Sequence, residues 1–258
     1  MLDFEYDKYE FIRMDALVME RLTSSPRIAN LYGHCGASVL TENLPIEVEE
    51  NVVPNGYIHT SELQDKDDVQ PQNTFTPSEK LDMALRMAEA LADLHGFKDG
   101  IIVHDDIQLC QYLYKSDNKT MKLNDFNRAE IMLYDEFTNQ YCPYLNGQGG
   151  GNWRAPEEYV DGPLTESIDT WSLGNNFYSL LTGLWVYPDD QDMSVMRDKI
   201  INGTLTSIDS RYKTHSFAEG KLVEIIQRIW EYNPRKRPSI FEIVQFLREA
   251  VEMNSKLI

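Results

Sequence analysis

Two aspartates, Asp106 and Asp125, each follow a short apolar run that predicts a buried strand. The residues between them predict a hairpin, with strands over 111–114 and 121–123 and a turn at 116–119. Because a hairpin returns the chain to its starting edge, we expect both carboxylates to lie at one edge despite nineteen residues of separation. One carboxylate could accept a proton and the other could hold a metal ion. Both could equally be ordinary turn residues.

The segments that contain these aspartates resemble motifs of the protein kinase family. HDDIQLCQ at 104–111 is similar to the catalytic loop H-R-D-L-x-x-x-N, and DFN at 125–127 is similar to D-F-G. The A-P-E motif is intact at 155–157, and two segments resemble later motifs, DTWSLG at 169–174 and PRKRP at 234–238. Five matches in the family's order are far more specific than any one of them.

The resemblance extends over residues 15–247 and implies a two-lobed α+β fold with an incomplete small N-terminal lobe. It implies ATP and Mg²⁺ as cofactors and a protein Ser, Thr or Tyr hydroxyl as the acceptor of the phosphoryl group. By the same resemblance Asp106 is the catalytic base and Asp125 is the principal Mg²⁺ ligand. Gln111 stands at the second metal position, where the family has Asn.

Residues 41–44 match the segment that lies against adenine in the family. Thr41 would be the gatekeeper, and Glu42 to Leu44 would form the hinge. The resemblance implies that the hinge backbone hydrogen-bonds the adenine edge.

Other matched positions have structural roles in the family. His104 and Phe126 would stack on each other, and Asp169 would anchor the backbone of the catalytic loop. Glu157 and Arg237 would form an ion pair beneath the segment that follows the D-F-G-like motif. These positions inform on the fold and not on activity.

The small lobe departs from the family pattern. Only about ten residues precede the first predicted helix, and none of them reads G-x-G-x-x-G or V-A-I-K. Lys8 lies too close to that helix to be the phosphate-binding lysine, and Asp15 stands where the family has a Glu that pairs with this lysine. Either the lobe is degenerate or the gene product is incomplete.

The catalytic motifs also carry substitutions. Asp105 replaces the Arg that holds an activation-loop phosphate, so we expect no switching by that route. Gln108 is neither of the residues that mark Ser/Thr or Tyr specificity, and Gln111 is longer than Asn by one methylene. Asn127 replaces Gly, and Asn tolerates the positive φ that the turn would require.

Two hypotheses follow from these matches and departures. The first is a protein kinase that transfers the ATP γ-phosphoryl group with weak or lost activity, and it depends on Asp106 and Asp125. The second is a catalytically inactive pseudokinase that acts as a binding or scaffold module. The sequence upstream of the first helix is the cheapest way to discriminate them.

The elements around the motifs suggest three parts. Residues 1–44 would form the partial small lobe, with a helix over 11–22 and strands over 28–32 and 38–44. Residues 45–75 are acidic and contain proline, which predicts a mobile hinge insertion. Residues 76–258 would form the large lobe.

The large lobe is predicted to be mainly helical. Its first helix has a capping box at Thr76 to Glu79 with Pro77 in the first turn. A buried helix is predicted from Asp169 to a glycine stop at Gly183. Further helices are predicted over 192–201, 218–230 and 239–252.

Composition restricts the partners. A net charge of −18 repels nucleic acid and anionic membranes, so we expect a protein substrate or a protein partner. The first residues lack the apolar core of a signal peptide, and no apolar run approaches the length of a membrane span. The three cysteines are widely spaced, which favours a reducing, cytoplasmic location.

Overall fold

The computed structural model describes residues 6–257, apart from residues 37, 57, 65, 118, 148, 152 and 191. The α-helices in this part are α1 (Tyr6–Arg21), α2 (Val48–Val52), α3 (Ser61–Gln64), α4 (Pro77–His95), α5 (Ser167–Thr182), α6 (Met193–Ile201), α7 (Tyr212–His215), α8 (Phe217–Ile229) and α9 (Ile240–Ser255). Short 3₁₀-helices are η1 (Leu109–Gln111), η2 (Pro156–Tyr159) and η3 (Pro234–Lys236). The strands are β1 (Leu31–Cys35), β2 (Ser38–Thr41), β3 (Ile46–Glu47), β4 (Ile101–Val103), β5 (Tyr112–Tyr114), β6 (Met121–Leu123), β7 (Glu130–Met132), β8 (Tyr134–Asp135) and β9 (Gln140–Tyr141).

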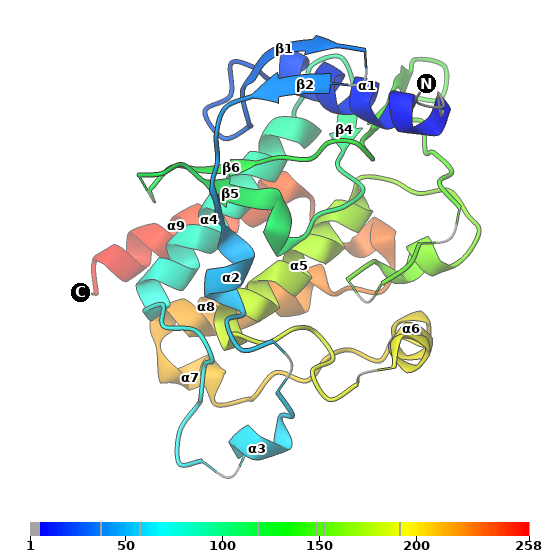
Figure 1. The fold of residues 1–258 in the computed structure, drawn as a ribbon. Coiled ribbons are helices and arrows are strands. Elements are labelled where there is room, and N and C mark those ends of the chain that lie inside the picture. Colours follow the sequence, from blue (N-terminus) through cyan, green and yellow to red (C-terminus); the bar gives the residue numbers. More distant parts are fainter. Residues whose placement is uncertain are drawn as a thin grey trace.

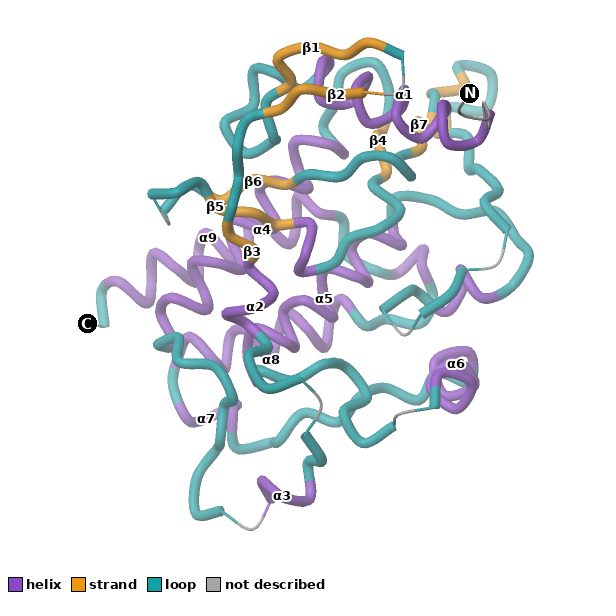
Figure 2. Tube along the Cα trace, viewed as in Figure 1, coloured by secondary structure: helices purple, strands orange, loops and turns teal. Residues whose placement is uncertain are grey.

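The elements separate into a small upper part and a larger helical part. In Figure 1, α1 and the β1–β2 hairpin lie at the top, and α4, α5, α8 and α9 lie beneath them. Figure 2 shows that the strands are short and lie in the upper half, whereas helices dominate the lower half. The predicted α+β class with a mainly helical large lobe is confirmed. No helix in the described ranges is long and apolar enough to cross a membrane.

Local sequence signals explain where α4 begins. The Thr76 hydroxyl accepts a hydrogen bond from the backbone of Glu79, and the Glu79 carboxylate accepts one from the backbone of Thr76 at 2.8 Å. The predicted capping box is therefore confirmed, with Pro77 as the first residue of the helix. The apolar face of α4, which includes Leu81 and Leu91, is fully buried against the other helices.

Helix α5 is the most deeply buried element of the large lobe, as its nearly all-round apolar composition predicts. It ends at Gly183, whose φ of 76° is the left-handed conformation expected of a glycine stop. A Cβ at this position would lie 2.5 Å from the backbone nitrogen of Asn73. The loop before α4 therefore packs directly on the end of α5.

The first strand begins later than predicted. Residues 28–32 were expected to form it, but β1 starts at Leu31. The backbone of residues 27–29 instead bonds to Leu123: the Ala29 N–H donates to the Leu123 carbonyl at 3.0 Å, and the Leu123 N–H donates to the Arg27 carbonyl at 2.8 Å. The backbone of this segment is thus hydrogen-bonded to β6 of the large lobe.

The prediction that residues 45–75 form a mobile insertion is wrong for much of that stretch. Strand β3 pairs with β5, with Ile46 opposite Tyr114. Val48 and Val52 of α2 are completely buried in the core. The two glutamates between them, Glu49 and Glu50, made this pattern hard to identify in so short a helix.

The predicted hairpin between the two aspartates is present as β5 and β6, with Tyr112 opposite Leu123. Gln111 lies in η1 and not in the strand, because its N–H donates to the carbonyl of Gln108 at 3.2 Å. In the turn, the Asp117 carboxylate accepts the N–H of Thr120 at 3.0 Å. Asn118, also assigned to this turn, lies outside the described residues.

Candidate active site

The catalytic-loop segment is held by Asp169 in the first turn of α5. Its carboxylate accepts the backbone N–H of His104 at 2.7 Å and that of Asp105 at 3.0 Å. The same carboxylate lies 3.0 Å from the Nε2 of His95. Since Asp169 is 1% exposed, these bonds form without competition from water. They place the next residue, Asp106, at a defined point at the end of β4.

Asp106 does not present a free carboxylate. Its Oδ1 accepts a hydrogen bond from the Gln108 amide at 2.8 Å and lies 3.3 Å from an Nη of Arg154. Its Oδ2 lies 3.4 Å from the amide nitrogen of Gln111. Three donors therefore surround the group that would accept a proton.

Asp125 lies at the start of a tight turn at the end of β6. Its φ is 63°, in the left-handed region. Asn127, which would tolerate a positive φ in place of the family's Gly, does not adopt one. The turn is stabilised from α1, where the Asp15 carboxylate accepts the N–H of Phe126 at 2.8 Å. Burial raises the pKa of Asp15, the bond from Phe126 offsets part of this rise, and the neighbouring Asp125 carboxylate adds to it.

The donors around Asp125 fit Mg²⁺ in part. Its carboxylate accepts no hydrogen bond from any described residue, so both oxygens are available to a hard cation. The Gln111 amide nitrogen lies 3.4 Å from the Asp106 carboxylate. Within the described ranges no three His, Cys, Asp or Glu side chains converge as a metal site. A cation here would therefore need oxygens from a bound phosphate, as Mg²⁺ commonly does.

The hinge residues are partly committed to other bonds. The Glu42 N–H donates to the Asn30 carbonyl at 3.0 Å, so it is not available to an adenine. The Glu42 side chain is buried and bonds to Lys122 at 2.5 Å and to Lys115 at 3.0 Å. Burial opposes ionisation of Glu42, but the bonds from Lys122, Asn30 and Lys115 outweigh it and lower its pKa. The carbonyl of Glu42, which follows Thr41, accepts no hydrogen bond from the described backbone. The N–H of Leu44 donates none to it.

The residues with predicted structural roles lie beside their expected partners. The rings of His104 and Phe126 are 5.3 Å apart between centroids. Arg237 donates to the Glu157 carboxylate at 2.8 Å and 3.2 Å. These contacts join segments that lie 22 and 80 residues apart in the sequence.

Sequence reasoning missed a buried charge cluster beside Asp106. Asp105 adopts a φ of 61°, is 2% exposed, and bonds to Arg128 at 3.2 Å. Arg154 donates to the Asp105 carbonyl at 3.0 Å and to Glu158 at 2.9 Å. The replacement of the family's Arg by Asp105 was the available signal, because a buried carboxylate requires cations nearby.

This cluster predicts a pH dependence of stability. Burial raises the pKa of Asp105 to about 6 and that of Glu158 to about 7, despite the attraction of Arg128 and Arg154. Because the folded pKa exceeds the unfolded value of 3.8, the folded state holds a proton on Asp105 that the unfolded state has lost. Its stabilising contribution is thus complete below pH 3.8 and is lost as the pH rises to about 6.

Between pH 4 and 8 the free energy of unfolding should fall less in Asp105→Asn than in the unmodified protein. We expect the difference to reach about 3 kcal/mol. The measurement is urea unfolding of both proteins at several pH values between 4 and 8. Asp99→Asn, which neutralises an exposed carboxylate, is the control and should follow the unmodified protein. Parallel curves for Asp105→Asn and the unmodified protein would show that Asp105 does not titrate in this range.

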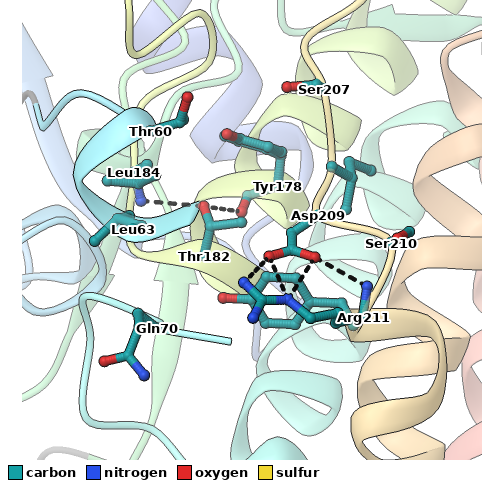
Figure 3. Close-up of a pocket in the computed structure, with 12 residues that line it drawn as sticks. Thr60, Leu63, Gln70, Tyr178, Thr182, Leu184, Ser207, Asp209, Ser210 and Arg211 are labelled. Atoms are coloured by element: carbon teal, nitrogen blue, oxygen red, sulfur yellow. Dashed lines mark hydrogen bonds and ion pairs between the residues drawn. The ribbon is translucent and has the colours of Figure 1, made fainter. Parts of the chain in front are cut away.

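A cavity of about 390 Å³ lies away from these residues, between the 60–70 segment, α5 and α7. Figure 3 shows its lining, with the Arg211 guanidinium facing the Asp209 carboxylate. The Arg211 and Asp209 side chains bond to each other at 2.6 to 3.1 Å. Their charges are therefore already paired and are not available to a ligand in the cavity. None of the predicted site residues lines it.

Comparison with known proteins establishes the family. Residues 5–247 match the family model described as the protein kinase domain. The match covers nearly the whole chain, which therefore belongs to the protein kinase family.

Individual relatives carry different kinase names. The chain is 27% identical over 195 residues to the dual specificity protein kinase shkE of Dictyostelium discoideum, covering 75% of this chain and 24% of that protein. It is 27% identical over 162 residues to the probable serine/threonine-protein kinase nek2 of the same organism, covering 63% and 35%. It is 28% identical over 179 residues to the insulin-like growth factor 1 receptor of Bos taurus, covering 68% and 25%. The chain thus spans about a quarter to a third of these relatives.

Proposed function

We propose that this chain is a protein kinase domain that binds ATP and Mg²⁺ and whose phosphoryl transfer to a protein hydroxyl is weak or lost. The predicted roles are those of a base for Asp106, metal ligands for Asp125 and Gln111, and an adenine-binding hinge near Thr41 and Leu44. When bound, Mg²⁺ would supply charge neutralisation for the phosphates.

The observation that carries the proposal is the occupied carboxylate of Asp106. A base accepts a proton through a free lone pair, and here Arg154, Gln108 and Gln111 all direct donors at that group. Arg154 is held in turn by Glu158, so it does not leave without stranding a buried charge. Proton transfer to Asp106 would therefore be confined to the lone pair of Oδ2 that these three donors leave open.

The position of Asp15 supports the same conclusion. In the family, a carboxylate on this helix holds the lysine that binds the phosphates. Here the Asp15 carboxylate bonds to the Phe126 N–H, and none of the described lysine or arginine side chains pairs with it. Because phosphoryl transfer depends mainly on placement and charge stabilisation, loss of this clamp reduces the rate severely.

We expect weak, Mg²⁺-dependent nucleotide binding with little discrimination between ATP and ADP. A ligand at a concentration equal to its Kd stabilises by only about 0.4 kcal/mol, which raises the melting temperature of a domain of this size by about 1–2 °C. Thermal-shift titrations with each nucleotide, with and without Mg²⁺, measure this. Asp125→Asn should abolish the metal dependence, and the exposed-site control Asp99→Asn should retain it.

A radiolabelled-ATP assay on a generic protein substrate tests transfer. We expect incorporation near background, with no further loss in Asp106→Asn. Micromolar, Mg²⁺-dependent ATP binding together with turnover abolished by Asp106→Asn would refute the proposal and establish an active kinase with an unconventional phosphate clamp.

The alternative is a pseudokinase that serves as a binding or scaffold module. The bonded state of Asp106 and the missing cation at Asp15 favour it over a fully active enzyme. Nucleotide binding without incorporation, at every Mg²⁺ concentration, would select this alternative. Under both hypotheses we expect the chain to bind a protein substrate or a protein partner, and to do so in the cytoplasm.

A further inference from the structure

The cavity of about 390 Å³ between the 60–70 segment, α5 and α7 has no role in the proposed function. Its volume lies within the range of sites that bind small organic molecules in proteins. Its walls combine three apolar side chains, Leu63, Leu184 and Ile208, with the rings of Tyr178 and Tyr212. Such a lining favours a largely apolar ligand, because the carbon surface of the ligand leaves water when it binds.

The charged groups around the cavity are already paired. Arg211 bonds to the Asp209 carboxylate and donates to the Lys66 carbonyl at 2.6 Å. Thr60, another lining residue, gives its N–H and its hydroxyl to the Asp189 carboxylate at 2.6 and 2.7 Å. These groups therefore leave no charge free to select an ionic ligand.

Two tyrosine hydroxyls remain open to a ligand. Tyr178 is 1% exposed and Tyr212 is 4% exposed, and neither hydroxyl makes a hydrogen bond of normal geometry to a described residue. Burial raises the pKa of Tyr178, and the neighbouring Thr182 hydroxyl offsets part of this rise. Because Thr182 donates its proton to the Tyr178 carbonyl at 2.8 Å, the Tyr178 oxygen can still accept a hydrogen bond. Tyr212 has no such neighbour and can donate.

Both hydroxyls are within reach of a molecule in the cavity. Both residues line it, and neither phenol oxygen is among the unpaired atoms of the described residues that are sealed from solvent. In Figure 3 the Tyr178 side chain extends away from the Arg211–Asp209 pair. Burial, Glu219 and Tyr178 raise the pKa of Tyr212, so the two hydroxyls lie close enough to interact.

The ligand group must both donate and accept a hydrogen bond. A carboxylate has no proton for Tyr178, and it would meet the negative field that Asp209 and Glu219 impose at Tyr212. An ammonium group cannot accept from Tyr212. A neutral carboxamide or hydroxyl group can do both without the cost of burying a charge.

We propose that this cavity binds a neutral organic molecule of one or two rings, whose carboxamide or hydroxyl group bonds to Tyr178 and Tyr212. The rings lie against Leu63, Leu184 and Ile208. Because Leu63 belongs to the 60–70 segment and the tyrosines belong to α5 and α7, the ligand also fastens this segment to the large lobe. None of the residues assigned to nucleotide or metal lines the cavity, so the inference is independent of the proposed function.

The first test compares three molecules with one two-ring skeleton by isothermal titration calorimetry on the full chain. Indole-3-carboxamide donates and accepts through its substituent, indole-3-carboxylate is the anionic counterpart, and 3-methylindole is the apolar one. We expect the carboxamide to bind about tenfold more tightly than either of the others, because only it forms both hydrogen bonds without burying a charge.

Variants without one hydroxyl locate the binding site. Tyr178→Phe and Tyr212→Phe should each weaken carboxamide binding by about fivefold and leave 3-methylindole binding unchanged. Tyr232→Phe is the control, because the Tyr232 hydroxyl bonds to the Ile201 carbonyl at 2.7 Å, away from the cavity. If either cavity variant does not fold, Ser207→Trp, at an exposed lining residue, should fill the cavity and abolish binding of all three molecules.

The second test follows hydrogen exchange of residues 58–64 by mass spectrometry. Indole-3-carboxamide at saturating concentration should slow exchange there several-fold, because Thr60 and Leu63 form one wall of the cavity. Exchange in α9, which contributes no lining residue, should not change.

Three results would overturn the inference. The first is no binding of the carboxamide at millimolar concentration. The second is equal affinity for the carboxamide, the carboxylate and 3-methylindole. The third is carboxamide binding that survives both tyrosine substitutions and Ser207→Trp, since the molecule would then lie elsewhere. The nucleotide and incorporation assays report on other residues, so their outcome does not decide this inference.

Discussion

Deleting residues 46–72 and closing the gap with a short Gly-Ser linker should lower the melting temperature by more than about ten degrees or prevent folding. The deletion removes β3 and the buried Val48, Val52 and Val69. Each fully buried aliphatic side chain contributes about 1.5–3 kcal/mol, and each kcal/mol is worth about 2–4 °C in a domain of this size. The expected loss therefore exceeds what a surface loop would cause.

A shorter deletion provides the matched control. None of the described residues in 54–67 is fully buried, although Thr60 donates to Asp189 at 2.6 and 2.7 Å. Removing only 54–67 should lower the melting temperature by a few degrees. Differential scanning calorimetry on the two deletions measures the contrast. Equal, small losses in both would mean that the buried valines contribute little to stability.

Arg237→Ala should cost about 3–5 kcal/mol of unfolding free energy. The Arg237 side chain is completely buried and donates to Glu157, to the Ser167 carbonyl at 2.6 Å and to the Glu231 carbonyl at 3.2 Å. Its guanidinium also lies over the Trp171 ring, 5.0 Å from the centroid. Truncation removes all these contacts and leaves the Glu157 carboxylate without its cation.

Glu157→Ala should cost less than Arg237→Ala. The Glu157 side chain retains 16% exposure, and Arg237 keeps two backbone carbonyls when the carboxylate is gone. In a double-mutant cycle measured by urea unfolding, the double variant should lose less than the sum of the single losses. Arg235→Ala, an exposed neighbour in η3, should change stability by no more than about 0.5 kcal/mol. Strict additivity would show that Glu157 and Arg237 do not interact in solution.

Features encoded by neighbouring residues were predictable from the sequence. The start of α4 follows from the Thr76–Glu79 capping box, and the end of α5 follows from Gly183, because caps depend on residues within one turn. The overall fold was predicted from the order and spacing of the family motifs and not from the periodicity of apolar residues. Those motifs also predicted which side chains would meet across long separations, such as Arg237 and Glu157.

Features that depend on tertiary packing were not predictable. The apolar Val48 and Val52 are separated by acidic residues, so a helix of five residues left too little pattern to identify a buried face. The bonds around Asp106 also depend on where the loop after it returns. Arg154 is 48 residues from Asp106, and nothing in its local sequence indicates that it points there.

The buried bond between Glu42 and Lys122 restricts how the small lobe can move relative to the large lobe. Their side chains are 5% and 3% exposed, and the adjacent segment at 27–29 is hydrogen-bonded to β6. Bending the β1–β2 hairpin away from the large lobe would strand both charges, at a cost of about 3–5 kcal/mol. The two lobes are therefore held rigidly and do not move easily relative to each other. A ligand bound between the lobes would meet two surfaces of fixed separation, and its size would decide binding more than its ability to draw the lobes together.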